Sequence, residues 1–115
     1  MENEKTVPHG TLKVSEEVIS TITKVSANEI DGVVSIVPVD GVFRRALIKS
    51  DFIKIRLLGD VVEITVAIVV RYGSKVTTVA EKIQESVKAS VQNMTGITVS
   101  RVNVVIAGIS FDTKQ

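Results

Sequence analysis

Apolar residues recur every three or four positions between residues 74 and 94, which is the spacing of one face of an α-helix. Polar and charged residues fill most of the intervening positions. Ser74 is placed to cap the start of this helix with its hydroxyl group, and Gly96 stands where a left-handed residue commonly ends one. We therefore predict a long amphipathic helix over residues 74–94. Its apolar stripe consists of Val76, Val79, Ala80, Ile83, Val87, Val91 and Met94.

A second helical pattern begins after Ser15, a capping residue that is followed by Glu16 and Glu17. Negative charge in the first turn is favoured there by the helix dipole. Asp31-Gly32 ends the helix. Its predicted buried stripe consists of Val18, Ile19, Ile22, Val25 and Ile30.

Five segments have the composition or alternation of β-strands. Residues 52–58 alternate apolar and polar positions, Gly59-Asp60 is a two-residue hairpin signal, and residues 61–71 form the returning strand. Residues 98–111 predict a last strand that is apolar on both faces near residues 104–106. Shorter strands are predicted at residues 11–14 and 33–37, and residues 38–51 are predicted as a loop. The inward set of the returning strand is Val62, Ile64, Val66, Ile68 and Val70.

The elements follow the order βαβββαβ, which predicts an α+β domain. Two helices would pack on one face of a small mixed or antiparallel sheet of four to five strands. We expect this single domain to span residues 10–111, with a flexible N-terminal tail over residues 1–9 and a C-terminal tail over residues 112–115.

Two helices cover only one face of such a sheet, so the opposite face is predicted to remain partly apolar. Exposed apolar patches commonly mark interaction sites. We therefore predict self-association or binding of a protein partner through this face, with an electrostatic contact from the nearby basic pair. The predicted interaction residues are Ala67, Val69, Val105 and Ile109, with Arg44 and Arg45 as the basic pair.

The composition narrows the class of protein. Among 115 residues, 44% are hydrophobic but only 3% are aromatic, so the core must consist mostly of Val and Ile, which favour strands. Fourteen basic and thirteen acidic residues give a net charge of +1, which provides no overall field for nucleic acid or an anionic membrane. No apolar run approaches the ~20 residues that span a bilayer, and no signal-peptide pattern is present. We expect a cytoplasmic protein without a membrane span.

Residues that commonly carry catalysis are scarce. The chain has no cysteine, and its one histidine, His9, lies in the predicted tail without a base or an orienting partner. The glycines match no phosphate-binding motif. Tyr72-Gly73-Ser74 could hold an anion at a helix start, although a turn followed by a cap is the plainer interpretation. We predict no catalytic residues, no metal site and no cofactor, and hence no enzyme.

Residues 44–56 contain the one local excess of basic charge. Arg44, Arg45, Lys49, Lys54 and Arg56 accompany a single acid in this interval. KH and RRM signatures are absent, and few aromatic residues are available for base stacking. Nucleic-acid binding is therefore not our first expectation. A small RNA- or ribosome-associated protein that uses this interval is the alternative function.

Several short motifs follow one another along the chain. Residues 10–19 read GTLKVSEEVI and residues 28–33 read NEIDGV. In the second half, YGS at residues 72–74 is followed by NMTGI at residues 93–97, VNV at residues 102–104 and GISFDTK at residues 108–114. In order and spacing these motifs resemble the alkaline-shock-protein family of bacterial cell-envelope stress-response proteins. The ending resembles a short housekeeping branch of that family.

This resemblance implies a non-enzymatic cytoplasmic protein that acts in cell-envelope homeostasis and in alkaline or general stress. It also implies higher-order assembly, and a small integral membrane protein as the partner that holds the chain at the membrane. For the short branch it implies a link to acetyl-CoA carboxylase and hence to fatty-acid supply. The family has no established catalytic residues to carry over. Stress-induced members tend to have longer acidic tails, so this near-neutral chain fits the housekeeping role.

Overall fold

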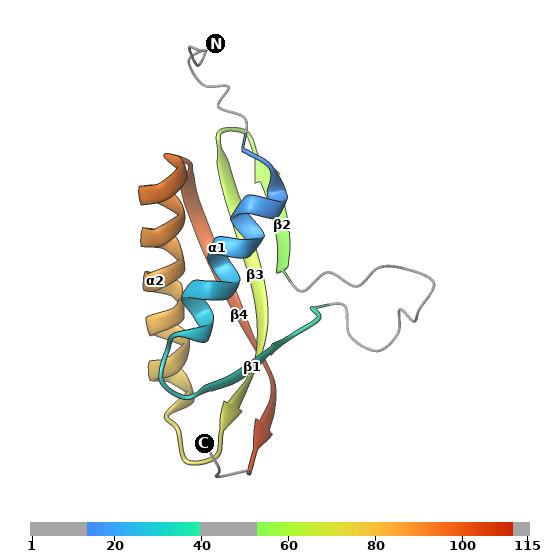
Figure 1. The fold of residues 1–115 in the computed structure, drawn as a ribbon, viewed down its shortest axis with the longest axis vertical. Helices are drawn as coiled ribbons and strands as arrows, with labels where there is room; N and C mark the ends of the chain where they lie inside the picture. The colour runs from blue at the N-terminus through green and yellow to red at the C-terminus, as the bar shows by residue number, and fades with distance from the viewer. Residues whose placement is uncertain (1–13, 40–52, 112–115) are drawn as a thin grey trace, which may run out of the picture.

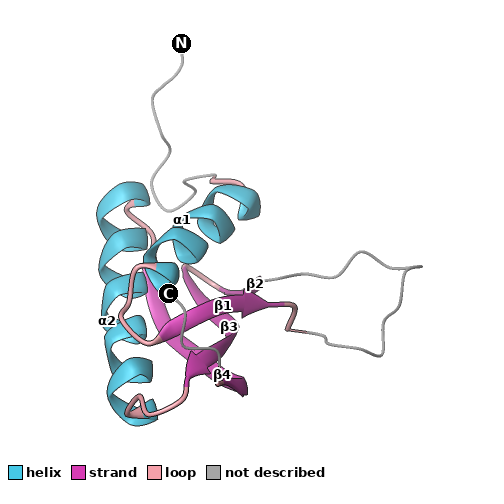
Figure 2. Cartoon of the chain, turned by 60° about the horizontal axis from the view of Figure 1, so that its bottom comes forward, coloured by secondary structure: helices cyan, strands magenta, loops and turns pink. Residues whose placement is uncertain are grey.

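The computed structural model describes residues 14–39 and 53–111, which form a four-stranded sheet with two helices on one face (Figures 1 and 2). This arrangement confirms the α+β class. The predicted strand at residues 11–14 lies outside the described residues, apart from Val14, which is not in a strand. The elements in chain order are α1 (Glu16–Asn28), β1 (Val33–Val37), β2 (Ile53–Leu58), β3 (Val61–Arg71), α2 (Val76–Thr95) and β4 (Thr98–Ser110).

Strand β3 lies at the centre of the sheet. Along one edge it pairs in parallel with β4 over its whole length. The other edge is shared by two antiparallel strands that lie end to end, with β1 on the second half of β3 and β2 on the first half. The chain leaves this edge after Val37, opposite Ala67, and returns at Ile53, opposite Val66. The sheet is therefore mixed, which is one of the two kinds that the sequence predicts.

The core lies between the sheet and the helices. All five predicted inward residues of β3 are at most 1% exposed, which confirms the predicted alternation. On the helix side of the core, α2 contributes four buried residues, Val79, Ile83, Val87 and Val91. Its predicted stripe ends earlier than expected, because Met94 is 71% exposed. The core is built from Val and Ile, whose branched side chains suit the pleated sheet.

Helix α1 is rotated about its axis relative to the prediction. Val18 and Val25 are 45% and 54% exposed, so their predicted burial was wrong. The buried face instead includes Ile19 and three small residues, and α1 packs against α2, β1 and β2. One of them, Thr23, satisfies its hydroxyl group within the helix by donating to the Ile19 carbonyl oxygen at 2.8 Å. Small buried residues allow close helix packing. Because Thr23 and Ser26 are polar, the pattern of apolar residues does not predict that this face is buried.

The helix ends agree with the prediction at Ser15 and Gly96 but differ at the other two points, since α1 already ends at Asn28, before the predicted Asp31-Gly32. The Val18 amide donates to the Ser15 hydroxyl oxygen at 3.2 Å, which confirms the cap of α1. Gly96 ends α2 in the left-handed conformation, with φ of 78°. The predicted cap at Ser74 was wrong, because Lys75 occupies the capping position and makes no side-chain cap bond.

Strand β4 contains an extra residue, Ala107, that changes which face the following side chains occupy. Ile68 of β3 pairs with Ile106, but the next residue, Val69, pairs with Gly108. Such a bulge shifts the alternation of side chains by one position. Residues of β4 after Ala107 therefore lie on the opposite face from the one that simple alternation predicts.

Gly32 packs the turn after α1 against the start of α2. Its φ is 102°, and a Cβ atom there would lie 2.8 Å from Cγ2 of Val79. We expect Gly32→Ala to lower the free energy of unfolding by about 2 kcal/mol, since it combines backbone strain with a clash. The matched control is Gly59→Ala in the hairpin turn, where φ is 68° and nothing lies within 4 Å. Urea denaturation of both variants checks this, and an equal or smaller loss for Gly32→Ala would contradict it.

Candidate interaction surface

The face of the sheet turned away from the helices, here called the outer face, is formed by alternate residues of all four strands (Figure 2). Neither described helix covers it. Residues that are paired across adjacent strands share a face, so the register assigns its members. Along β3 the outer residues change from polar to apolar. The outer face therefore has a polar half, beside β2, and an apolar half, beside β1.

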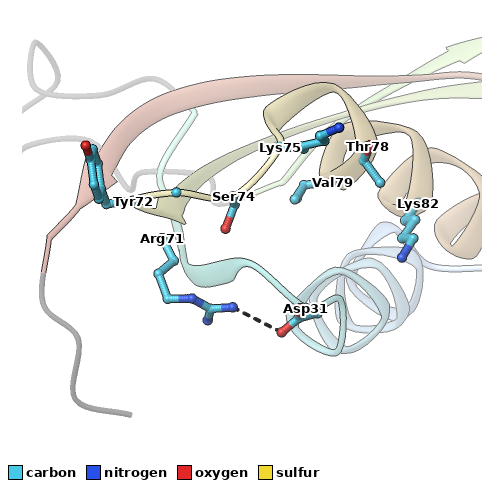
Figure 3. A pocket seen from close by; sticks show the side chains of 9 residues that line it. Asp31, Arg71, Tyr72, Ser74, Lys75, Thr78, Val79 and Lys82 are labelled. Atoms are coloured by element: carbon cyan, nitrogen blue, oxygen red, sulfur yellow. Dashed lines mark hydrogen bonds and ion pairs between the residues drawn. The ribbon is translucent and has the colours of Figure 1, made fainter.

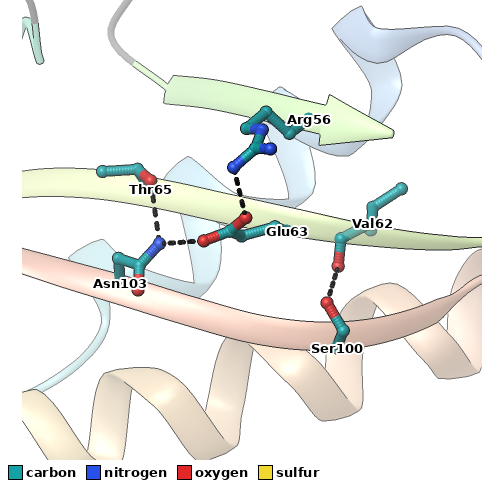
Figure 4. A network of polar contacts seen from close by, with 6 residues as sticks. All are labelled: Arg56, Val62, Glu63, Thr65, Ser100 and Asn103. Carbon is teal, nitrogen blue, oxygen red and sulfur yellow. Dashed lines mark hydrogen bonds and ion pairs between the residues drawn. The ribbon is translucent and has the colours of Figure 1, made fainter. Parts of the chain in front are cut away.

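The polar half is organised around Glu63 of β3 (Figure 4). One carboxylate oxygen lies 3.1 Å from Nη1 of Arg56 on β2, and the other accepts a hydrogen bond of 2.8 Å from the Asn103 amide on β4. Asn103 also donates to the Thr65 hydroxyl at 3.2 Å. The Glu63 side chain is 15% exposed, whereas that of Arg56 is 66% exposed. Glu63 thus connects three strands through side-chain bonds.

The apolar half, here called the apolar patch, consists of Val37, Ala67, Val69 and Val105. Ala67 lies between Val37 on one side and Val105 on the other, and only 2% of it is exposed. Val105 stands on β4, the last strand of the sheet, and is 45% exposed. Val69 faces Gly108, which has no side chain to cover it. The patch is therefore most open on the side of β4.

The structure brings together three of the four predicted apolar interaction residues. Ala67, Val69 and Val105 share the outer face, as predicted. The predicted position of Ile109 on this face was wrong, because the extra residue Ala107 places it opposite Val70, on the inner face. Arg44 and Arg45 lie outside the described residues. A role of these side chains in association stays a prediction.

The bonds around Glu63 are not predictable from the sequence pattern. Alternation alone places Glu63 and Thr65 on the outer face, but their bonding partner on β4 depends on the register. The bulge that follows Val99 sets that register, because Val62 pairs with Val99 whereas Glu63 pairs with Arg101. A bulge has no reliable signal in a single sequence, so Asn103 could not be assigned to Glu63.

A cavity of about 320 Å³ lies near the start of α2 (Figure 3). Three basic residues line it, but the guanidinium of Arg71 is 3.1 Å from the Asp31 carboxylate and is therefore already paired. Tyr72 points away from the cavity in Figure 3, and its ring stacks on Phe111 with centroids 4.7 Å apart. The positive charge of the lining suits a small anion. The lining contains no histidine or cysteine, so its hydroxyl groups have no neighbouring base to activate them for catalysis. The remaining basic residues are Lys75 and Lys82.

The described part of the basic interval does not form a separate cationic patch. Arg56 is held by Glu63 on the outer face. Lys54 is exposed on the same face, opposite Thr65. The other basic residues of this interval lie outside the described residues, so the alternative function gains no support from the described geometry.

Residues 14–39 and 53–111 contain neither a cluster of metal-binding side chains nor a membrane-spanning helix. No group of three His, Cys, Asp or Glu residues there could hold a metal ion, and His9 is not among these residues. In the same part of the chain, neither helix is long and apolar enough to cross a membrane.

Comparison with known sequences gives one family and several relatives. The family of alkaline shock protein 23, described as having a cell envelope-related function, matches residues 4–111. The uncharacterized protein YqhY of Bacillus subtilis (strain 168) is 31% identical over 112 residues, which cover 91% of this chain and 81% of that protein. The uncharacterized protein Spy1614 of Streptococcus pyogenes serotype M6 is 31% identical over 106 residues, covering 87% and 88% respectively.

Solved structures of the MamM CTD have a similar fold. One variant has a TM-score of 0.53 and 18% identity, and the match covers 84% of this chain and 95% of that chain. The manganese form of another variant has a TM-score of 0.51 and 17% identity, with coverage of 82% and 99%. At this level of identity the similarity concerns the fold alone.

The bonds around Glu63 generate a test of the polar half. Glu63→Ala is expected to lower the free energy of unfolding by about 1–2 kcal/mol, because it leaves one N–H of the part-buried Asn103 amide without an acceptor. Arg56→Ala should cost less than about 1 kcal/mol, since the exposed guanidinium is screened by solvent. Urea denaturation of the two variants measures both values. A larger loss for Arg56→Ala would show that Glu63 does not organise this half.

Proposed function

The chain belongs to the family of alkaline shock protein 23, whose function is related to the cell envelope, and we propose that this chain contributes a non-enzymatic module for protein interaction and assembly. The apolar patch is the observation that carries the proposal. It lies on a sheet face that no described helix covers (Figure 2). On that face Val105 is 45% exposed.

The arrangement of the outer face has the character of a protein interface. Interfaces commonly combine an apolar centre with a polar rim, and the rim contributes specificity more than affinity. Here the apolar patch borders the bonded side chains around Glu63, which hold Arg56 and Asn103 in fixed positions. A second protein could bury Val69 and Val105 and align its own polar groups with this fixed border. Self-association is the simplest form of such binding.

The finer parts of the proposal extend the function of the family. We propose that the module acts in envelope homeostasis, held peripherally at the membrane by a small integral membrane protein. The same resemblance supports a link to acetyl-CoA carboxylase and fatty-acid supply. These parts rest on the resemblance and not on the geometry of the outer face.

Val69→Glu tests the proposal, because it places a charge in the apolar patch but outside the core. We expect it to weaken association at least ~100-fold, since an unpaired charge buried in an interface is strongly unfavourable. Sedimentation velocity measures the association, and thermal unfolding checks that the fold is kept. Leu58→Glu is the matched control, because Leu58 lies on the same face near the polar half and is 40% exposed.

Capture of the same proteins from detergent-solubilised cells extends this test to partners. Wild type and Leu58→Glu should retain a small membrane protein or carboxylase subunits, and Val69→Glu should lose them. Unfolding of Val69→Glu would show that Val69 belongs to the core. Capture of ribosomal proteins alone, lost on nuclease treatment, would favour the alternative function.

A further inference from the structure

Strand β4 forms one edge of the sheet. It is 13 residues long and pairs with β3 on one side only among the described residues. An edge strand presents unpaired backbone N–H and C=O groups, to which another strand can bind. Natural proteins usually cover or interrupt such edges. The partners of these backbone groups therefore show how much of the β4 edge is open.

Two glutamines of α2 close the first part of this edge. The Gln92 side-chain oxygen accepts a hydrogen bond of 3.0 Å from the Val99 amide. The Gln84 side-chain amide donates to the Val102 carbonyl oxygen at 3.1 Å. Val99 and Val102 therefore direct their backbone groups away from β3, and side chains from the helix already satisfy one group on each.

Among residues 14–39 and 53–111, no side chain covers the second part of the edge in this way. Backbone groups alternate in direction along a strand, so Val104 and Ile106 also point away from β3, as Val102 does. At the end of β4 the Ser110 carbonyl accepts a hydrogen bond from the Tyr72 amide at 2.8 Å. The backbone groups of Ser110 therefore point toward β3, and those of Ile109 point away from it. From Val104 to Ile109, no described group bonds the outward N–H and C=O groups.

The opposite edge of the sheet is less suited to pairing. It is divided between β1 and β2, and the chain leaves it between Val37 and Ile53. Pro38 directly follows β1, and Lys54 and Arg56 lie within β2. Breaks, prolines and charges are common devices that prevent edge pairing. On β4, by contrast, the edge from Val102 to Ile106 contains no break, proline or charge, and bulges at Ser100 and Ala107 bound it on either side.

We propose that two copies of this chain pair along β4, antiparallel about a two-fold axis at Val105, which specifies the surface used in the self-association proposed above. In this register the N–H and C=O groups of Val104 in one copy bond to the C=O and N–H groups of Ile106 in the other. By symmetry, Ile106 of the first copy pairs in the same way with Val104 of the second. The two Val105 side chains then face each other. This register uses only backbone groups that no described residue bonds, and it keeps the hydrogen bond from Gln84 to the Val102 carbonyl oxygen.

Three properties of β4 favour a second copy as the occupant. An antiparallel pair of identical strands is self-complementary, and a two-fold axis is the commonest symmetry of homo-oligomers. Arg101, the one charged residue of β4, lies outside the paired run, so like charges do not meet across the axis. Pairing also places both outer faces on the same side, which joins the apolar patches of the two copies into one surface around Val105.

A cysteine at the axis tests this pairing directly, because the chain has no natural cysteine. Facing side chains in such a pair have Cβ atoms about 5 Å apart, which a small adjustment brings within disulfide reach. We expect Val105→Cys to form a covalent dimer at least ~10-fold faster than Leu58→Cys under mild oxidation. Leu58 is the matched control, since its exposure of 40% is close to the 45% of Val105 and it lies on the same face.

Val105→Lys provides a second, non-covalent test. Like charges would face each other at the axis, so the dissociation constant measured by sedimentation velocity should rise about tenfold or more, with unchanged thermal unfolding. Association of the wild type without preferential Val105→Cys crosslinking, or without weakening by Val105→Lys, would overturn the pairing but leave the proposed function standing. A wild type that stays monomeric and binds no partner would contradict both.

Discussion

Strand β3 is the constraint on which every other element depends, because its two edges and one face are all used within the domain. Its inner residues, from Val62 to Val70, are at most 1% exposed and form the floor of the core. One edge is divided between β1 and β2, and β4 takes the whole of the other. Because β3 is central, β4 is an edge strand, and the two glutamines of α2 bond only the first part of its far edge. The features proposed for association follow from this position.

The two faces of β3 differ because the helices lie on only one of them. On the outer face, Glu63 bonds to residues of β2 and β4 and ties the polar half together without a covering layer. Further along β3, Ala67 and Val69 replace these polar residues. Side-chain hydrogen bonds cannot satisfy an apolar surface, which is stabilised when it is buried away from water. In the polar half of the outer face the side chains bond to one another, whereas in the apolar half Val105 remains exposed to solvent.

Much of this fold was predictable because its signals are local. Alternation and the Gly59-Asp60 turn predicted the β2–β3 hairpin, and helical spacing with Gly96 predicted α2. The errors have physical causes that lie outside local patterns. Thr23 can be buried because its hydroxyl group bonds to a carbonyl oxygen within α1. The prediction placed only apolar residues on the buried face of this helix and therefore chose the wrong face. Ile109 was misplaced by the extra residue in β4, although Ala67, Val69 and Val105 were correctly grouped. The order of the strands depends on pairing between distant segments, which periodicity does not encode.

The most direct measurement is residue-resolved amide hydrogen exchange of the wild-type protein by NMR, at low and high protein concentration. Paired copies predict that the Val104 and Ile106 amides exchange rapidly when dilute and become protected as concentration rises. The Val105 amide, which faces β3, should be protected at both concentrations. Rapid exchange of Val104 and Ile106 at every concentration would contradict pairing along β4. Protection at a concentration at which sedimentation shows only monomer would also contradict it, because another segment of the same chain would then cover the edge.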